Sequence, residues 1–329
     1  MKWLITGGAG FLGRNLCRRL TDSGGHTIRV VDNLSVGGEE PLNHAMGGKV
    51  RICPKDMPGP MIAGAAPELI VADIAEAEVA VAAAAGADII IHLAANTGVP
   101  QSVAHPRVDC ITNVLGTLNY LEACRVSNVG RFVFASSGAP LGESTPPIHE
   151  ESVPHPISPY GASKLAGEGY CSAYFHSYGV ETVALRFGNV YGPGSGHKTS
   201  VVAKFIGQAL RGEVLEIYGD GNQTRDFIHV DDLVDGILRA SSVPGIGGEV
   251  FQIASGRETT LHELVEQLAA IFDGAGLPRP VVKTSEPRHG DVTRNFSDTS
   301  KAKQRLDWTP RVSLADGLRQ TLRSLADVG

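Results

Sequence analysis

The stretch Lys2-Trp3-Leu4-Ile5-Thr6-Gly7-Gly8-Ala9-Gly10-Phe11-Leu12-Gly13 opens the chain of 329 residues and decides its fold. An apolar run is followed at once by glycines at positions 7, 10 and 13, and then by a helical pattern over Arg14–Leu20. Such a turn needs glycines because side chains would keep the backbone away from a pyrophosphate at the positive N-terminus of the helix. The stretch predicts a strand, a phosphate-binding turn and a helix. A tight turn that binds no ligand is the alternative.

A carboxylate follows this turn at the separation that a dinucleotide site requires. Asp32 ends the apolar run Thr27–Asp32 and follows Gly13 by 19 residues, close to the roughly 20 at which an acid accepts hydrogen bonds from the adenosine ribose. Its charge would repel a 2′-phosphate, so the sequence favours NAD over NADP. Asp73, at the end of the third apolar run, is expected either to bond the adenine amino group or to cap its strand.

Apolar runs alternate with helical patterns up to about residue 190, which predicts an α/β fold. The predicted strands are Lys2–Thr6, Thr27–Asp32, Leu69–Asp73, Asp88–Leu93, Arg131–Ala135 and Thr182–Phe187. Several are apolar throughout, as in strands buried on both faces, so we expect a doubly wound parallel sheet of the Rossmann type. We expect residues 1–187 to form the dinucleotide-binding domain and 188–329 a smaller substrate domain. The run Glu249–Ala254 is expected to return to the main sheet.

Composition and charge exclude several classes of protein. The chain is 42% hydrophobic, and its 29 Lys and Arg residues against 35 Asp and Glu residues give a net charge of −6, which argues against nucleic-acid and membrane-surface partners. The longest apolar stretch, Val79–Leu93, is interrupted by Gly86, Asp88 and His92 and is too short for a membrane span. Five cysteines without a Cys-x-x-Cys pair indicate neither a disulfide framework nor a zinc site. We expect a soluble, cytoplasmic protein.

A tyrosine and a lysine stand four residues apart in Tyr160-Gly161-Ala162-Ser163-Lys164. On a helix this spacing places both side chains on one face. The lysine cation and a positive nicotinamide ring would favour phenolate, so we expect the pKa of Tyr160 to be lowered until the phenol can take a hydroxyl proton. An exposed Tyr and Lys at helical spacing is the alternative.

The run Arg131–Ala135 leads directly into Ser136-Ser137. This places two hydroxyls at the carboxyl end of the predicted sheet, where ligands bind in open α/β folds. A hydroxyl there can share a hydrogen bond with the substrate oxygen that loses its proton. A turn or cap serine is the alternative.

With these residues in place, the sequence resembles the extended short-chain dehydrogenases/reductases, in particular the NAD-dependent nucleotide-sugar epimerases and dehydratases. The resemblance covers nearly the whole chain. It is carried by Thr6–Gly13, Asp32-Asn33, His92-Leu93-Ala94-Ala95, Asn113–Thr117, Ser136-Ser137, Tyr160–Lys164 and Leu185–Pro193.

The resemblance implies a role for each matching position. Tyr160 would be the base, Lys164 would bond the nicotinamide ribose and tune Tyr160, Ser137 would contact the reacting oxygen, and Asn113 would support the site. A homodimer through helices near Asn113–Cys124 and Tyr160–Tyr178 is also implied. The expected NAD contacts are Gly7, Gly10, Phe11, Leu12, Gly13, Asp32, Asn33, Ser35, Asp73, Ile74, Leu93, Ala94, Ala95, Asn113, Tyr160, Lys164 and Phe187.

A diphosphate substrate is indicated by two arginines in loop contexts, Arg225 and Arg288. Forked guanidinium groups suit a diphosphate, although either arginine could be a solvated surface charge. The resemblance implies that both hold the diphosphate of a sugar nucleotide and that Asp291 contacts the nucleoside, which points to a uridine diphosphate sugar without excluding thymidine. The expected substrate contacts are Ser136, Ser137, Asn189, Val201, Arg225, Arg288 and Asp291.

Departures from the family pattern favour one reaction. The similar 4,6-dehydratases carry Asp-Glu directly after the catalytic hydroxyl residue, and similar uridine diphosphate glucuronate decarboxylases carry a Glu two positions after it; this chain has Gly138-Ala139. The remaining chemistry is oxidation of the sugar 4-hydroxyl and return of the same hydride, without a metal. The resemblance therefore implies a 4-epimerase. A decarboxylase or 4-ketoreductase of the same family, and an NAD-binding sensor or scaffold, are the alternatives.

The sugar is left open by the sequence. Asn295 stands at the family's size gate, where enzymes restricted to plain hexoses carry a tyrosine, so a bulkier substituent could fit. His197-Lys198 could meet a C6 carboxylate, or could be solvated loop charges. Glucose, glucuronate and N-acetylglucosamine are the candidates.

Overall fold

A computed structural model describes residues 1–196, 200–286 and 293–326 of the chain. By contacts between Cα atoms these fall into two compact units, which are described separately. The first comprises Met1–Gly142, Val153–Arg186 and Gly236–Phe251, and the second Glu143–Ser152, Phe187–Asp235 and Gln252–Gly329. This division differs from a single border after residue 187 in three places, because Glu143–Ser152 and Phe187 group with the second unit and Gly236–Phe251 with the first.

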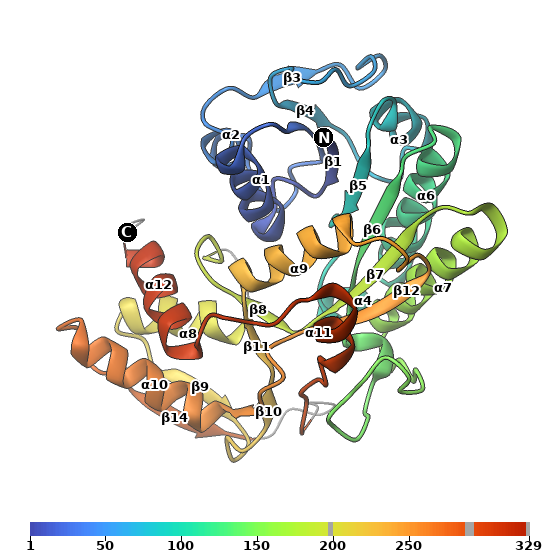
Figure 1. The fold of residues 1–329 in the computed structure, drawn as a ribbon. Coiled ribbons are helices and arrows are strands. Elements are labelled where there is room, and N and C mark those ends of the chain that lie inside the picture. Colours follow the sequence, from blue (N-terminus) through green and yellow to red (C-terminus); the bar gives the residue numbers. More distant parts are fainter. Residues whose placement is uncertain (197–199, 287–292, 327–329) are drawn as a thin grey trace. The chain divides into compact units, whose positions relative to one another are not determined.

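The first unit is built on a sheet of eight strands in the order β12-β7-β6-β5-β1-β2-β4-β3 (Figure 1). The strands are β1 (Lys2–Thr6), β2 (Thr27–Asp32), β3 (Arg51–Cys53), β4 (Glu68–Val71), β5 (Ile89–His92), β6 (Arg131–Ser137), β7 (Thr182–Phe187) and β12 (Glu249–Ile253). The pairs of β1 with β2 and β5, of β4 with β2 and β3, and of β5 with β6 are all parallel. The predicted doubly wound sheet is confirmed, and the expected return run Glu249–Ala254 contains β12.

Helices cover both faces of this sheet. Successive side chains along a strand point to opposite faces, and in these strands the side chains on both faces are mostly apolar and must be covered. The helical elements of this unit are α1 (Phe11–Ser23), α2 (Glu39–Ala45), α3 (Ala77–Ala84), α4 (Val99–Ala104), α5 (Pro106–Cys110), η1 (Ile111–Leu115), α6 (Gly116–Val126), η2 (Ala139–Leu141) and α7 (Pro159–Tyr178). Helix α9 (Val230–Ser242) begins in the second unit and belongs to the first from Gly236 onward. In Figure 1, α1 and α2 lie on one side of the strands, and α3, α6 and α7 on the other.

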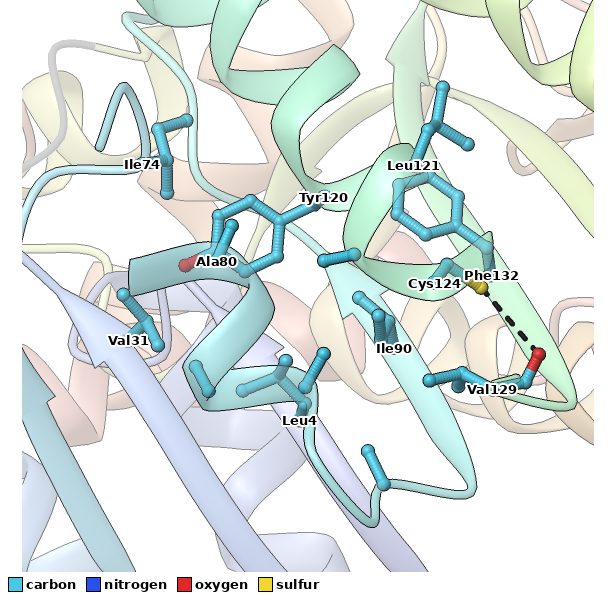
Figure 2. Close-up of a cluster of buried hydrophobic side chains, with 14 of the residues drawn as sticks. Leu4, Val31, Ile74, Ala80, Ile90, Tyr120, Leu121, Cys124, Val129 and Phe132 are labelled. Atoms are coloured by element: carbon cyan, nitrogen blue, oxygen red, sulfur yellow. Dashed lines mark hydrogen bonds between the residues drawn. The ribbon is translucent and has the colours of Figure 1, made fainter. Parts of the chain in front are cut away.

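The core of the first unit lies between the sheet and the layer of α3, α6 and α7. Figure 2 shows Leu4, Val31 and Ile90 of the sheet in one buried cluster with Tyr120 and Leu121 of α6. All five side chains are completely buried. Burying side chains of this size contributes about 1.5–3 kcal/mol each relative to leaving them exposed. The rigid strand ends that carry the candidate site therefore rest on this core.

The strand order changes direction between β1 and β5. The chain continues from β1 to β2 on one side of this point and from β5 to β6 on the other. In open α/β sheets, ligands bind outside the carboxyl ends of the strands at such a switch point. The glycine turn follows β1 and the His92-Leu93-Ala94-Ala95 segment follows β5. The fold thus brings two of the sequence motifs to one place.

The second unit contains three small sheets and four helices within the described residues. Its elements are β8 (Asn189–Tyr191), α8 (Val201–Leu210), β9 (Leu215–Tyr218), β10 (Thr224–Arg225), β11 (Phe227–His229), β13 (Thr259–Thr260), α10 (Leu261–Gly274), β14 (Val282–Ser285), α11 (Ser300–Leu306) and α12 (Leu314–Ala326). β8 pairs with β11 and β9 with β14, both parallel, while β10 pairs antiparallel with β13. A separate apolar cluster, including Phe205, Leu264 and Leu318, joins α8, α10 and α12.

None of the described helices combines the length and hydrophobicity that crossing a bilayer requires.

Candidate active site

The glycine turn has the close backbone approaches that its sequence predicts. Gly7 has a φ of +69°, and a Cβ at this position would lie 2.7 Å from the backbone nitrogen of Ala94. A Cβ at Gly13 would lie 2.4 Å from the carbonyl oxygen of Gly7. Helix α1 starts at Phe11, and its N-cap residue Gly10 supplies no side chain to its first N–H groups. The positive end of α1 is therefore free of a side-chain cap, as a site for a phosphate requires.

Asp32 is bound to the glycine turn. Its Oδ2 accepts a hydrogen bond from the N–H of Ala9 over 2.9 Å, and its Oδ1 accepts one from the N–H of Leu34 over 2.8 Å. Burial raises the pKa of Asp32, and the two backbone hydrogen bonds oppose this shift. A carboxylate has about four lone-pair positions. Each oxygen can therefore still accept a ribose hydroxyl, so the turn and the acid together fit a dinucleotide.

The second expected adenosine contact, Asp73, follows β4 by two residues rather than ending the strand. Its Oδ1 accepts from the N–H of Ala75 over 2.9 Å, and its Oδ2 accepts from the side-chain amide of Asn33 over 2.8 Å. Asp73 thus caps its own turn, which is one of the two expectations. The hydrogen bond also holds the exposed Asn33 beside Asp32.

Asn113 lies in η1, a π-helical turn between α5 and α6. π-helical turns inside helices are frequently found at functional sites. The buried Asn113 amide accepts from the N–H of Asn96 over 2.8 Å and donates to the carbonyl of Asn96, to Asp109 Oδ1 and to Ser163 Oγ over 3.0–3.1 Å. One side chain therefore joins the segment after β5, α5 and the first turns of α7.

Tyr160 and Lys164 lie on one face at the start of α7. The helix begins at Pro159, with Ser158 as N-cap accepting from the N–H of Gly161 over 3.1 Å. The Nζ of Lys164 lies 6.0 Å from the centroid of the Tyr160 ring and donates to the carbonyl of Ala135 over 2.7 Å. Ser137, the last residue of β6, lies close enough to the Tyr160 phenol to lower its pKa. The structure thus brings Ser137, Tyr160 and Lys164 together.

Burial dominates the ionisation of this group. Desolvation raises the pKa of Tyr160 to about 12, and the nearby Ser137 hydroxyl only partly opposes this shift. Desolvation also lowers the pKa of Lys164 to about 8. The direction for Tyr160 is opposite to the one expected from the Tyr-Lys spacing, because in the chain alone the cost of burying phenolate exceeds the effect of an ammonium group at this distance.

The two adjacent serines differ in what they contact. Neighbouring residues of a strand point to opposite faces, and Ser136 is buried with its hydroxyl donated to Glu168 Oε1 over 2.6 Å. Glu168 also accepts from Nε and Nη2 of Arg186, both over 2.8 Å. The expectation that both hydroxyls serve the substrate is therefore corrected: Ser136 is committed to a buried ion pair, and Ser137 is the serine beside Tyr160.

Three of the expected substrate contacts lie in the second unit. Asn189 is exposed in β8, and its N–H donates to the carbonyl of Asp226 over 2.7 Å. Arg225 is half-buried in β10, where its Nη1 donates to the carbonyl of Thr224 over 2.8 Å. Val201 is the first residue of α8. The side-chain oxygens of Asp226 accept from Ser255, Gly256 and Ser297, so they fix the backbone next to Arg225.

The other expected contacts are distributed as follows. Phe11 and Ile74 are buried in the core, so only their backbone could reach a ligand. Leu12, Leu93, Ala94 and Ala95 are half-buried, Ser35 is exposed, and Phe187 is the last residue of β7. Arg288, Asp291, His197 and Lys198 lie outside the described residues. Asn295 is half-buried, and its N–H donates to Thr224 Oγ1 over 3.2 Å.

Sequence reasoning missed the buried charges that surround the Tyr-Lys pair. Asp109, Glu168 and Arg186 are each no more than 6% exposed. A usable signal existed for two of them: Arg186 is a charge inside an apolar strand, and Glu168 follows Lys164 by four residues on the same helix face. Buried charges are normally paired, so these two residues could have been predicted as partners.

A family model agrees with the geometry. Residues 3–254 match the NAD dependent epimerase/dehydratase family, and this range contains the glycine turn, Asp32 and the group Ser137, Tyr160 and Lys164. The chain belongs to this family. NAD is accordingly its cofactor, and the glycine N-cap of α1 and the acceptor positions of Asp32 fit that molecule.

Proteins similar to this member of the family include several 4-epimerases. The UDP-glucose 4-epimerase of Mycolicibacterium smegmatis is 35% identical over 98% of this chain and 97% of its own length. The UDP-glucuronate 4-epimerase of Thermodesulfobacterium geofontis is 33% identical over 71% of each chain. The crystal structure of the UDP-glucose 4-epimerase of Thermotoga maritima with UDP-glucose has a TM-score of 0.86 and 36% identity, covering 100% of this chain and 99% of the other.

Proposed function

We propose that this family member is an NAD-dependent UDP-sugar 4-epimerase. The observation that carries the proposal is the group formed by the buried Lys164 with the half-buried Tyr160 and Ser137 at the carboxyl end of β6. Its neighbours in the chain support the choice of reaction. Gly138 and Ala139 carry no ionisable side chain where similar dehydratases carry an acid pair, and the N–H of Ala139 donates to Ser137 Oγ over 3.2 Å.

The chain's own residues divide the work as follows. NAD, when bound, supplies a hydride acceptor and a positive ring. Tyr160 takes the proton of the sugar 4-hydroxyl and later returns it, while Ser137 holds the reacting oxygen. Lys164 favours phenolate by its charge and bonds the nicotinamide ribose. The positive charges of Lys164 and the ring act against the desolvation that raises the pKa of Tyr160 in the chain alone.

Epimerisation requires the 4-keto sugar to present both faces to the same hydride. The nucleotide must therefore be held firmly and the sugar loosely. We assign the diphosphate to Asn189, Arg225 and Arg288 and the nucleoside to Asp291, with Val201 as a further contact. A forked guanidinium suits a diphosphate better than a point charge does.

UDP-glucose is the first candidate substrate, because the Mycolicibacterium and Thermotoga relatives, which match over at least 98% of the chain, are named for it. UDP-glucuronate is the second, supported by the cationic pair His197-Lys198 and by the Thermodesulfobacterium relative. Incubation with UDP-glucose, UDP-glucuronate, UDP-N-acetylglucosamine and dTDP-glucose, with the C4 epimers resolved by chromatography, tests both the reaction and the sugar.

Each outcome separates one alternative from the others. Net consumption of added NADH would indicate a reductase, and release of carbon dioxide from the glucuronate would indicate a decarboxylase. NAD binding without turnover of any of the four sugars would indicate a sensor. Production of a C4 epimer without net change in NAD supports the epimerase.

We also propose that the protein acts as a homodimer. Val108, Ile111 and Leu115 recur at helical spacing along α5 and η1 and are 54%, 38% and 48% exposed. Apolar side chains on one helical stripe are typical of a surface that a partner covers. Light scattering should give the mass of a dimer, and Leu115→Glu should give a monomer. A monomeric wild-type protein would contradict the dimer.

A further inference from the structure

Lys164 carries its charge in the dry interior of the first unit. The residue is 3% exposed, and within the described part of the chain its one hydrogen bond is the 2.7 Å donation to the carbonyl of Ala135. The ammonium also lies 4.8 Å from the centroid of the Phe134 ring. A carbonyl and an aromatic face compensate a buried charge only partly, so anionic groups nearby must contribute to its stability.

Four ionisable groups besides Tyr160 interact electrostatically with this ammonium: His92 on β5, Asp109 on α5, which packs against α7, and Glu168 and Cys171 on α7 itself. His92 is neutral because burial lowers its pKa to about 3. Cys171 is a neutral thiol because burial raises its pKa. Glu168 is already paired through both oxygens with Arg186. Of these four groups, Asp109 is therefore the carboxylate that is not paired with another cation among the described residues.

Asp109 has an unusual arrangement for a purely structural carboxylate. The residue is 1% exposed; its Oδ1 accepts from Asn113 over 3.0 Å, and its Oδ2 has no hydrogen-bond partner among the described residues. A buried carboxylate oxygen without a partner is costly. It forms no direct ion pair with Lys164, so the two charges interact through the low-dielectric interior, where such interactions are strong.

We propose that Asp109 is the counter-charge of Lys164, a positioning residue whose buried carboxylate lies on α5 where it packs against α7 and holds the amide of Asn113, which is hydrogen-bonded to Ser163 beside Lys164. The idea rests on the proposed function for its consequence in catalysis, since the ammonium is the group that would favour the phenolate of Tyr160. The same carboxylate raises the pKa of Tyr160 and opposes the desolvation of Lys164. Its net effect is to widen the pH range in which Lys164 is charged.

A double-mutant cycle of stability tests the pairing without any substrate. Asp109→Asn, Lys164→Met and the double variant are unfolded reversibly in denaturant between pH 6 and pH 10. We expect a favourable coupling between the two residues at pH 6–7 that vanishes as the pH rises past about 8, where Lys164 becomes neutral. The cycle of Lys164→Met with Asp273→Asn, an exposed carboxylate on α10, is the matched control and should give no coupling.

The catalytic consequence is read from pH profiles of the NAD-loaded protein. The ratio of kcat of Asp109→Asn to that of the wild type should be near one at low pH and fall as pH rises. Without the carboxylate, Lys164 loses its proton more easily, so the alkaline limb of the kcat–pH profile moves down by about one pH unit. Asp109→Glu, which keeps the charge, should restore part of the activity. A coupling of zero at every pH, or a ratio that is low but independent of pH, overturns the proposal.

These two readouts also separate the proposal from the proposed function. A wild-type protein that epimerises no UDP-sugar would contradict the function, while the stability cycle would still decide the pairing. If the Lys164→Met protein does not fold, the stability difference between wild type and Asp109→Asn decides it instead. That difference should shrink as the pH passes about 8, and its persistence at higher pH would refute the counter-charge.

Discussion

Thr6 and His92 are register partners on β1 and β5, and their side chains are hydrogen-bonded between Oγ1 and Nδ1 over 3.0 Å with both residues completely buried. The second ring nitrogen of His92 is bonded to Thr117 Oγ1 over 3.2 Å, and Thr6 Oγ1 also accepts from the N–H of Ala94 over 3.2 Å. The pair therefore fixes the strand ends that carry the glycine turn and the Leu93-Ala94-Ala95 segment.

His92 should make the protein sensitive to acid. Burial and the charge of Lys164 lower its pKa to about 3, so below pH 6.5 the unfolded chain binds a proton that the folded chain does not. Stability is thus lost as the pH falls from 6.5 toward 3. From pH 7 to pH 5, the advantage of the wild type over His92→Gln should shrink by about 2 kcal/mol in chemical denaturation. A constant difference would show that His92 is protonated in the folded state.

Tyr160→Phe removes the proposed base and leaves the ring in place. We expect kcat to fall by about 10²–10⁴-fold, the usual contribution of a positioned acid or base, with NAD binding retained. Tyr178→Phe, an exposed tyrosine at the end of the same helix, is the control and should keep full activity. Equal rates for Tyr160→Phe and wild type would remove Tyr160 from the mechanism.

Gly13→Ala should destabilise the first unit and weaken NAD binding. The added methyl would lie 2.4 Å from both the carbonyl oxygen of Gly7 and the Cα of Gly8, and such overpacking costs about 1–3 kcal/mol. Gly169→Ala is the matched control, because a Cβ there meets nothing within 4 Å and an alanine favours a helix by up to about 1 kcal/mol. Thermal unfolding should shift down for the first variant and up for the second; equal shifts would contradict the packing.

Lys164→Met should raise stability while abolishing activity. Because its pKa in the folded chain is about 8, below the ordinary value, the buried ammonium destabilises the folded state at lower pH, and this cost fades as the pH rises above 8. Removing it should stabilise the protein by about 1–3 kcal/mol at pH 7. Lys283→Met, on the exposed strand β14, should change stability by less than about 0.5 kcal/mol. A strongly destabilised Lys164→Met protein would contradict the burial cost.

The features that depend on a local sequence pattern, namely the longer strands and the spaced motifs, could be predicted. Strands β1, β2 and β7 begin and end where their apolar runs do. The glycine turn, Asp32 and the Tyr160-Lys164 pair were predicted from spacing, and Ser137 from its place after a strand and from the family resemblance. The second unit was harder, because strands of two to four residues such as β8 and β10 are too short to show a period. β3 was missed for the same reason: only three residues form it, and two are exposed.

The electrostatics of the site could not be predicted from spacing. The direction of the Tyr160 shift depends on how deeply α7 is buried, and the roles of Ser136 and Ser137 depend on which face of β6 meets Glu168. Asp109 precedes Asn113 by four residues, but its approach to Lys164 is created by packing α5 against α7. These are properties of tertiary packing and not of any local motif.

The central claim is that one hydride leaves C4 of the sugar and returns to the same carbon. The direct measurement uses the fastest UDP-sugar substrate carrying deuterium at C4, with NAD-loaded protein and free NAD in solution. We predict that the C4 epimer retains the label and that none appears in free NADH or in water. Loss of the label to either pool, or absence of a C4 epimer from every UDP-sugar tested, would contradict the account.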